Sequence, residues 1–317
     1  MKRTNRFIRI LGVCSYIFCV SQTFAYDEPI VNLGFTSFLD GTTPSGPGFY
    51  FQDYLQYYTS NRLNGNNGDK LPLPHTSLDV TANLFQLIYL SKQKIWQANW
   101  GIDFIAPWLM QANINDGLGR TVLDAQTGAG DIVIGPMFQF DPIMGANGPR
   151  FVQRFEFDFI VPTGKYNPKY AVNPGSNFWS FNPYWSATLW FTKQWSSSIR
   201  LYYLWNAKNN NPNLAFGSGV NSTQAGRAVF ANITTEYGLT EKFYLGLNGY
   251  IFDQVTDTKV NGSSVPGRRE YVWAIGPGLL YSFTKNDFLF FNSYFEQDAK
   301  NRPQGSNFVA RYVHHFS

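Results

Sequence analysis

Cysteine is nearly absent from this 317-residue chain, and its two copies, Cys14 and Cys19, lie close to the N-terminus. The rest of the chain can therefore form neither a disulfide nor a cysteine-ligated zinc site. Charged residues make up only 15% of the sequence, whereas about 25% is usual. No Gly-Lys-Ser/Thr phosphate-binding loop and no histidine pair at metal-binding spacing occurs, so we expect no cofactor and no metal.

The first 25 residues have the features of a cleaved secretory signal. Four basic residues precede an apolar stretch over residues 10–20, and the small residue Ala25 follows. The apolar stretch is shorter than the ~20 residues that a helix needs to cross a bilayer. Val13 and Phe18, which precede the two cysteines, are too large for a lipoprotein signal. Removal of residues 1–25 leaves 21 basic and 21 acidic residues, so the pI of 8.9 indicates no nucleic-acid partner.

Beyond the signal there is no apolar run long enough for a membrane-spanning helix, although 18% of the residues are aromatic. Apolar and polar residues instead alternate with the period of two that is typical of half-buried strands. Over residues 151–161 the two faces carry very different side chains. One face carries Phe155, Phe157 and Phe159, and the other carries Arg154, Glu156 and Asp158.

This alternation predicts twelve strands. They are expected at residues 49–59, 76–90, 95–109, 129–141, 151–162, 178–192, 196–206, 227–238, 243–254, 270–284, 287–298 and 307–316. Short links, the first at Ser91–Lys94, alternate with long polar loops, the longest being Ala207–Gly226. An even strand count with this alternation is typical of a transmembrane antiparallel β-barrel in the outer membrane. We therefore expect an all-β barrel of about 12 strands over residues 49–317.

Residues 26–48 stand apart as an N-terminal leader, because a Gly/Pro-rich stretch separates them from the first strand. The leader is expected to enter the lumen as a plug, or else to form a further strand or a periplasmic tail. At the other end of the chain, apolar residues alternate up to Phe316, as in the signal read by the barrel-assembly machinery. Ser317 departs from the commonest form of that signal.

Aromatic residues at strand ends are expected to form the two girdles at the membrane interfaces. They are Tyr57, Tyr58, Trp96, Trp108, Trp179, Trp190, Trp195, Trp205, Tyr271 and Tyr281.

Ionisable residues within the strands are expected to face the lumen, because a charge facing lipid costs ~2–4 kcal/mol at the bilayer midplane. With neighbouring tyrosines, the candidates for the lumen and solute path are Asp79, Asp103, Arg154, Glu156, Asp158, Tyr184, Arg200, Tyr202, Glu236, Tyr294, Glu296 and Arg311. They form either a polar lining that sets selectivity or a salt-bridged filling that stiffens a narrow barrel. Lys165 and Tyr166, after Pro162, are candidates at the outer mouth.

Several stretches resemble the outer-membrane family of the phenol-degradation meta-pathway, also called SphA-like. They include Phe38-Leu39-Asp40-Gly41, Pro47-Gly48-Phe49-Tyr50, Gly130-Asp131-Ile132-Val133, Val161-Pro162-Thr163-Gly164, Asn173-Pro174-Gly175-Ser176 and Val313-His314-His315-Phe316. The resemblance covers essentially the whole chain after the signal. It implies a channel or uptake protein that is encoded beside aromatic degradation pathways, and it carries over no catalytic residues.

The expected function is passive uptake of small hydrophobic or aromatic compounds across the outer membrane, with membrane lipid and the solute as partners. A structural or surface-interaction barrel with a filled lumen is the first alternative. An outer-membrane lipid hydrolase is less favoured, because His75, His314 and His315 stand in no Ser/His/Asn or paired-Asp arrangement. We therefore expect no enzyme.

Overall fold

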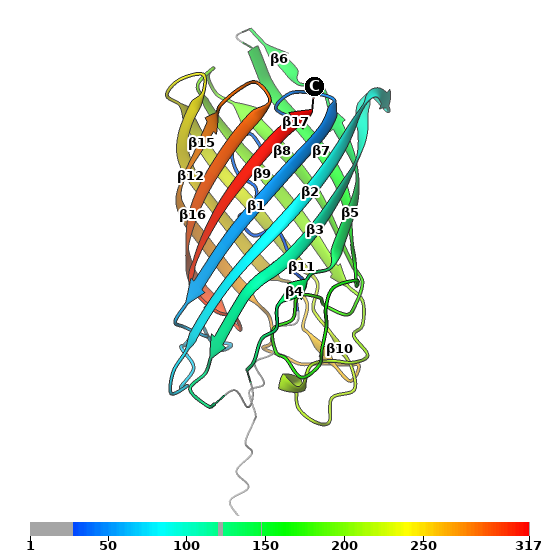
Figure 1. The fold of residues 1–317 in the computed structure, drawn as a ribbon, viewed down its shortest axis with the longest axis vertical. Helices are drawn as coiled ribbons and strands as arrows, with labels where there is room; N and C mark the ends of the chain where they lie inside the picture. The colour runs from blue at the N-terminus through cyan, green and yellow to red at the C-terminus, as the bar shows by residue number, and fades with distance from the viewer. Residues whose placement is uncertain (1–27, 120–122, 147, 317) are drawn as a thin grey trace, which may run out of the picture.

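The computed structural model describes residues 28–119, 123–146 and 148–316, so the expected signal over residues 1–25 lies outside it. Within these ranges twelve long strands form one closed antiparallel barrel, as predicted (Figure 1). The strands are β1 (Gly48–Ser60), β2 (Ser77–Ile95), β3 (Ala98–Asn115), β5 (Ile132–Phe140), β7 (Gly148–Val161), β8 (Ser180–Trp190), β9 (Trp195–Asn206), β11 (Ala228–Gly238), β12 (Phe243–Gln254), β15 (Tyr271–Ser282), β16 (Asp287–Lys300) and β17 (Ser306–Phe316).

Pairing of the first and last strands closes the sheet. β1 and β17 run antiparallel from Phe49 opposite Phe316 to Thr59 opposite Ser306. Every other strand pairs with its neighbours in the chain, so no long edge is left with unpaired backbone groups. Closure is what a sheet in hydrocarbon requires, because no water is present there to satisfy free N–H and C=O groups.

The two ends of the barrel differ in their connections. Short turns gather at the end where the chain terminates, together with β6 (Ile143–Gly145), and we call this the short-turn end (Figure 1). The long-loop end carries short elements only. They are β4 (Gly128–Ala129), β10 (Thr223–Gln224), β13 (Lys259–Val260), β14 (Ser263–Ser264) and the single 3-10 turn η1 (Leu214–Phe216).

The first turn lies further along the chain than predicted. β2 continues through the expected link at Ser91–Lys94 and ends at Ile95. The chain then reverses at Trp96 and Gln97, whose φ angles are +50° and +67°. Two positive φ values in a two-residue loop match the right-handed twist of the flanking strands, which is why such turns are favoured in hairpins. The prediction placed the turn at polar residues and missed this backbone preference.

The alternating pattern separates the two faces of the barrel wall. On β7, Phe157 is 37% exposed on the outer face, whereas the neighbouring Glu156 is 1% exposed on the inner face. Exposed large apolar side chains recur on β2, β3, β9, β12 and β16, so the outside of the barrel is an apolar surface suited to lipid. No helix in the described ranges has the length and apolar character needed to span a membrane.

Three assignments to a face were wrong. Asp79 lies on the outer face of β2, where its carboxylate accepts a hydrogen bond from Tyr57 at 3.1 Å. It sits near the outer end of the strand, where the cost of a charge falls to about 0–1 kcal/mol, so the midplane argument does not apply to it. Tyr58 and Trp190, predicted for the girdles, instead line the interior.

The leader, residues 28–47, runs inside the barrel (Figure 1). Glu28 binds Asn206 at the long-loop end of β9, and Ser45 binds the Lys285 carbonyl at the short-turn end. The leader therefore crosses the full length of the lumen before the chain turns back into β1. Its apolar residues Phe35 and Phe38 belong to two separate hydrophobic clusters that it forms with the barrel wall.

Candidate functional site

Polar side chains of the wall hold the leader at every level of the lumen. Asn232 accepts a hydrogen bond from the Gly34 amide at 3.0 Å, and Thr188 accepts one from the Gly41 amide at 2.9 Å. Further contacts come from Glu236, Ser198, Asn292, Asn307 and Gln139. Buried backbone groups must be paired. Because the leader has no strand partner, these side chains take the place of a sheet.

Two glycines let the leader approach the wall closely. Gly34 has a φ of +80°, and a Cβ there would lie 2.6 Å from the Tyr294 ring. A Cβ on Gly41 would lie 2.5 Å from the Thr188 backbone nitrogen. Any larger residue at either position would push the leader away from β16 or β8.

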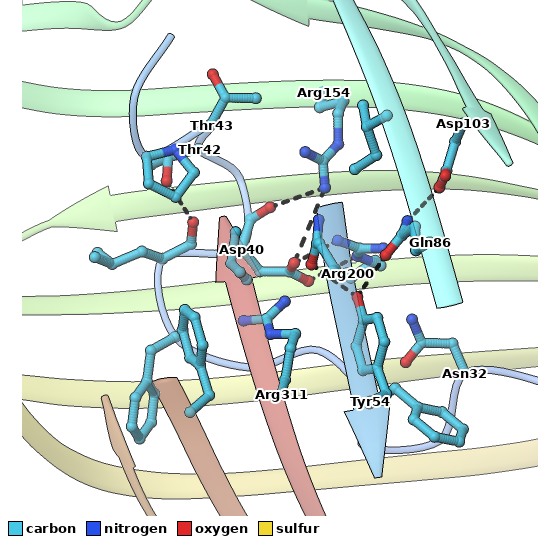
Figure 2. A pocket seen from close by; sticks show the side chains of 18 of the residues that line it. Asn32, Asp40, Thr42, Thr43, Tyr54, Gln86, Asp103, Arg154, Arg200 and Arg311 are labelled. Carbon is cyan, nitrogen blue, oxygen red and sulfur yellow. Dashed lines mark hydrogen bonds and ion pairs between the residues drawn. The ribbon is translucent and has the colours of Figure 1, made fainter. Parts of the chain in front are cut away.

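Asp40 is the charged centre of the leader. Its carboxylate accepts hydrogen bonds from Nε of Arg200 on β9, at 2.7 Å, and from Nη2 of the same residue. Nη2 of Arg154 on β7 lies 4.0 Å from the Asp40 carboxylate (Figure 2). All three side chains are buried. Two barrel arginines therefore share one leader carboxylate.

Carboxylates on β7 itself complete this network. Nε of Arg154 lies 3.9 Å from Glu156, which also accepts a hydrogen bond from the Tyr184 hydroxyl. The Arg200 guanidinium lies over the Tyr184 ring, 4.2 Å from its centroid. Beside Glu156, Gly135 leaves room for carboxylates, since a Cβ there would meet Asp158 Oδ1 at 2.3 Å.

A second buried network surrounds Glu296 nearer the long-loop end. Glu296 accepts hydrogen bonds from the Tyr58 hydroxyl at 2.7 Å and the Tyr250 hydroxyl at 2.8 Å. The Gly305 amide donates to it at 2.8 Å, and Nη2 of Arg302 lies 3.8 Å away. These contacts join β1, β12, β16 and the last loop around one carboxylate.

Two cavities remain beside the leader. The inner cavity, of about 470 Å³, opens toward the short-turn end. The outer cavity, of about 260 Å³, lies beneath the long loops. Both are lined by the leader residues Ile30, Val31 and Phe35. Side chains of the leader thus border both spaces.

With the exception of Asp79, the side chains predicted to face the lumen are buried inside the barrel. They are Asp103, Arg154, Glu156, Asp158, Tyr184, Arg200, Tyr202, Glu236, Tyr294, Glu296 and Arg311. Tyr202 stacks on Phe230 with the centroids 4.2 Å apart, and Tyr294 packs against Tyr250. Most of these groups therefore contact each other or the leader.

The residues predicted at the mouth lie at the long-loop end. Lys165 is exposed, and its Nζ donates to the Thr127 carbonyl at 3.0 Å. Tyr166 lines the outer cavity, and its hydroxyl donates to the Asn211 carbonyl at 2.7 Å. Both side chains connect neighbouring loops.

Sequence reasoning missed Asp40, Tyr54 and Gln86. Asp40 lies in the Phe38–Gly41 stretch that carries the family resemblance, and this was the available signal. Tyr54 and Gln86 could have been placed inward by strand parity alone, and the Tyr54 hydroxyl donates to Gln86 at 2.7 Å.

The histidines do not form a catalytic arrangement. His315 packs on Tyr50, and His314 contacts Asp287 at 2.7 Å at the short-turn end. His75 lies in a loop at the other end of the barrel, far from both. Within the described ranges, no group of three or more His, Cys, Asp or Glu side chains has a geometry that could hold a metal ion.

A closed twelve-stranded barrel with an apolar exterior and a polar interior defines the class: this chain has the fold of an outer-membrane channel. The chain belongs to the family described as "Putative MetA-pathway of phenol degradation", whose model matches residues 60–312. The resemblance seen in the sequence is thereby confirmed. In this class the short turns and the C-terminus face the periplasm, and the long loops face outward.

The COG4313 outer membrane channel from Pseudomonas putida F1 has a similar solved structure, with a TM-score of 0.77 and 17% identity. The match covers 89% of this chain and 100% of that chain. At this identity the likeness establishes the fold alone. No curated protein matches the sequence.

Two further barrels are similar at a lower level. They are the TodX deltaS2S3 mutant monoaromatic hydrocarbon channel, with a TM-score of 0.45 and 8% identity over 87% of this chain and 93% of that chain, and the toluene transporter TbuX from Ralstonia pickettii, with a TM-score of 0.38 and 11% identity over 86% and 90%. These scores are too low to bear on the function of this chain.

Proposed function

We propose that this protein is a passive outer-membrane channel for small hydrophobic or aromatic compounds, and that its leader is a plug dividing the path. The observation that carries the proposal is the pair of cavities on either side of Ile30, Val31 and Phe35. The inner cavity has the size of a small-molecule site, the outer one is slightly smaller, and both are bordered by aromatic and aliphatic side chains. Family membership supports the same substrate class.

The proposed path begins at the outer cavity beneath the long loops. A solute binds there among Leu78, Leu109 and Phe178, passes the leader when the leader shifts, and enters the inner cavity. Release follows into the periplasm or sideways through the wall. No energy source is required, since the solute moves down its own gradient.

Uptake into liposomes tests this proposal. The protein is reconstituted with its leader and, in parallel, as a form lacking residues 26–48, and the entry of phenol, toluene and benzoate is followed. We expect uptake above that of empty vesicles from the full chain and faster uptake from the truncated form. Heat-dependent migration on gels verifies that both forms are folded barrels. If neither form raises permeability above the empty bilayer, the channel proposal is wrong.

A surface-interaction barrel with a sealed lumen is the second candidate. It is favoured by one observation, the extent to which the leader and buried charge networks occupy the interior. The long loops would then be the working part. In the loop Ala207–Gly226, Ala215 packs against Leu123 and Ala171 of the neighbouring loops.

Deletion of the loop Ala207–Gly226 separates the two candidates. A channel should keep or increase its solute uptake, because Asn209 and Asn213 of this loop border the outer cavity and their removal widens it. A surface-interaction barrel should lose its partner while showing no uptake before or after the deletion. His75→Ala, with an assay of lipid hydrolysis, tests the less favoured hydrolase.

A further inference from the structure

Arg311 on β17 differs from the other buried arginines of the lumen. Arg154 and Arg200 share Asp40, and Arg302 lies near Glu270 and Glu296. In the described ranges no carboxylate lies within ion-pair distance of Arg311, although it is only 6% exposed. Its Nε–H is buried without a hydrogen-bond partner, as is that of Arg154. A buried cation without a counter-charge is costly, so its retention points to a role.

Two aromatic rings flank the guanidinium of Arg311. The guanidinium carbon lies 3.8 Å from the centroid of the Phe290 ring and 5.9 Å from that of Tyr54. A guanidinium stacked on a ring directs its N–H groups within its own plane, away from the stacked face. Arg311 lines the inner cavity, and Figure 2 shows it reaching from β17 into the space that also holds Asp40 and Tyr54.

The wall next to Arg311 on the periplasmic side is apolar. Phe288, Phe290, Leu280 and Val313 form one hydrophobic cluster there with Phe38 of the leader. Phe290 stands opposite Arg311 in the β16–β17 pairing, and Phe288 stands opposite Val313. The inner cavity is therefore lined by the Arg311 guanidinium and, next to it, by this apolar cluster.

The strand carboxylates that line the cavity lie on β3 and β7, which do not neighbour β17. Asp103 lies on β3, three strands from β17, which corresponds to ~14 Å at the usual strand spacing. Tyr54 and Gln86 lie between Arg311 and Asp103, and Gln86 donates a hydrogen bond to Asp103. Glu156 is already engaged by Arg154 and Tyr184. Asp40 faces the same space, but its carboxylate is already paired with Arg154 and Arg200.

We infer that the inner cavity binds the anion of a small aromatic acid, with its carboxylate on Arg311 and its ring against Phe288, Leu280 and Phe38. This inference rests on the proposed uptake function and assigns its substrate class. A carboxylate matches the planar fork of arginine in a two-bond arrangement. The ring then fills the apolar side of the same space, so charge and aromatic surface are recognised together.

Binding to the full-length protein in detergent, followed by titration calorimetry, tests the assignment with three probes. Benzoate carries both features, benzamide keeps the ring and shape without the charge, and acetate keeps the charge without the ring. We expect benzoate to bind tightest. Arg311→Gln should weaken benzoate binding about ten- to a hundredfold, the usual range for a lost charged hydrogen bond, and leave benzamide binding unchanged.

Two further variants make the experiment decisive. Arg227→Gln removes the same charge from an exposed site just before β11 and should change neither affinity. Arg311→Lys keeps the charge but loses the fork, so its benzoate affinity should be intermediate. Arg311→Lys also tests the site if Arg311→Gln fails to fold. Equal affinities of the unmodified protein for benzoate and benzamide, or for benzoate and acetate, would overturn the assignment, as would an unchanged benzoate preference in folded Arg311→Gln.

Toluene uptake in liposomes separates failure of this site from failure of the channel. If toluene enters and the benzoate preference is absent, the anion site is wrong and the uptake function stands. If benzoate binds with the expected preference and neither solute enters, the site stands and the channel is wrong.

Discussion

The carboxylate of Asp40, in the leader, lies against the side of the Arg200 guanidinium, with Nε donating to Oδ2 at 2.7 Å and Nη2 donating to Oδ1. This pair joins a segment without sheet partners to the middle of β9. Arg154 also faces Asp40, so one leader carboxylate is shared by two buried cations of the wall. The contact therefore contributes to the stability of the barrel as well as to the position of the leader.

Asp40→Asn should loosen the plug and weaken the barrel. Loss of one partner from a buried ion pair costs about 3–5 kcal/mol, because the other charge remains buried. We expect a lower free energy of unfolding in urea and a higher single-channel conductance. The double variant Asp40→Asn with Arg200→Gln should unfold less readily than Asp40→Asn alone, while its conductance stays high. Unchanged conductance in the single variant would mean that the pair does not hold the plug.

Gly34→Ala should displace the leader from the wall. The new Cβ would lie 2.6 Å from the Tyr294 ring, so either the ring or the leader must shift, and overpacking of this kind costs typically about 1–3 kcal/mol. Solute permeability is therefore expected to rise. Gly46→Ala is the matched control, because Gly46 has a similar φ of +78° and nothing lies within 4 Å of its Cβ position. Equal effects of the two variants would point to backbone strain in place of the contact.

Glu296→Ala should be among the most destabilising single changes in the barrel. It removes the shared acceptor of Tyr58, Tyr250 and the Gly305 amide and leaves Arg302 with one fewer counter-charge. We expect a loss of about 3–5 kcal/mol in urea unfolding. Glu296→Gln, which keeps an acceptor oxygen, should lose less. Near-identical unfolding of both variants and the parent would show that this network contributes little.

Asp79→Asn should leave solute uptake and ion selectivity unchanged, because the side chain lies on the outer face near the rim and bonds to Tyr57. An exposed contact of this type is worth about 1 kcal/mol or less. Asp103→Asn provides the contrast, since its carboxylate lies in the inner cavity. We expect the ratio of cation to anion permeability to change only for Asp103→Asn. A change in ion selectivity with Asp79→Asn would mean that Asp79 does contribute to the solute path.

Strand parity accounts for what could be predicted of the site. On β7 the pattern of Phe155, Glu156 and Phe157 leaves one possible orientation, because only the face that carries the phenylalanines is apolar enough to contact lipid. β2 was harder to orient, since apolar residues occupy both of its faces around Leu84, Phe85 and Leu87 in the middle of the strand. The prediction for Asp79 therefore rested on the free-energy cost of a charge facing lipid at the bilayer midplane, and that cost is much smaller at the rim.

The amino-acid sequence by itself determined the all-β class, the twelve strands, the alternation of short turns and long loops, and the family. These follow from local patterns, since period-two alternation and turn residues are properties of neighbouring positions. The tertiary structure decided the path of the leader, the pairing of Asp40 with Arg200 across 160 residues, and the isolation of Arg311. Such relationships depend on which strands closure brings face to face across the lumen, and no local pattern encodes that distance.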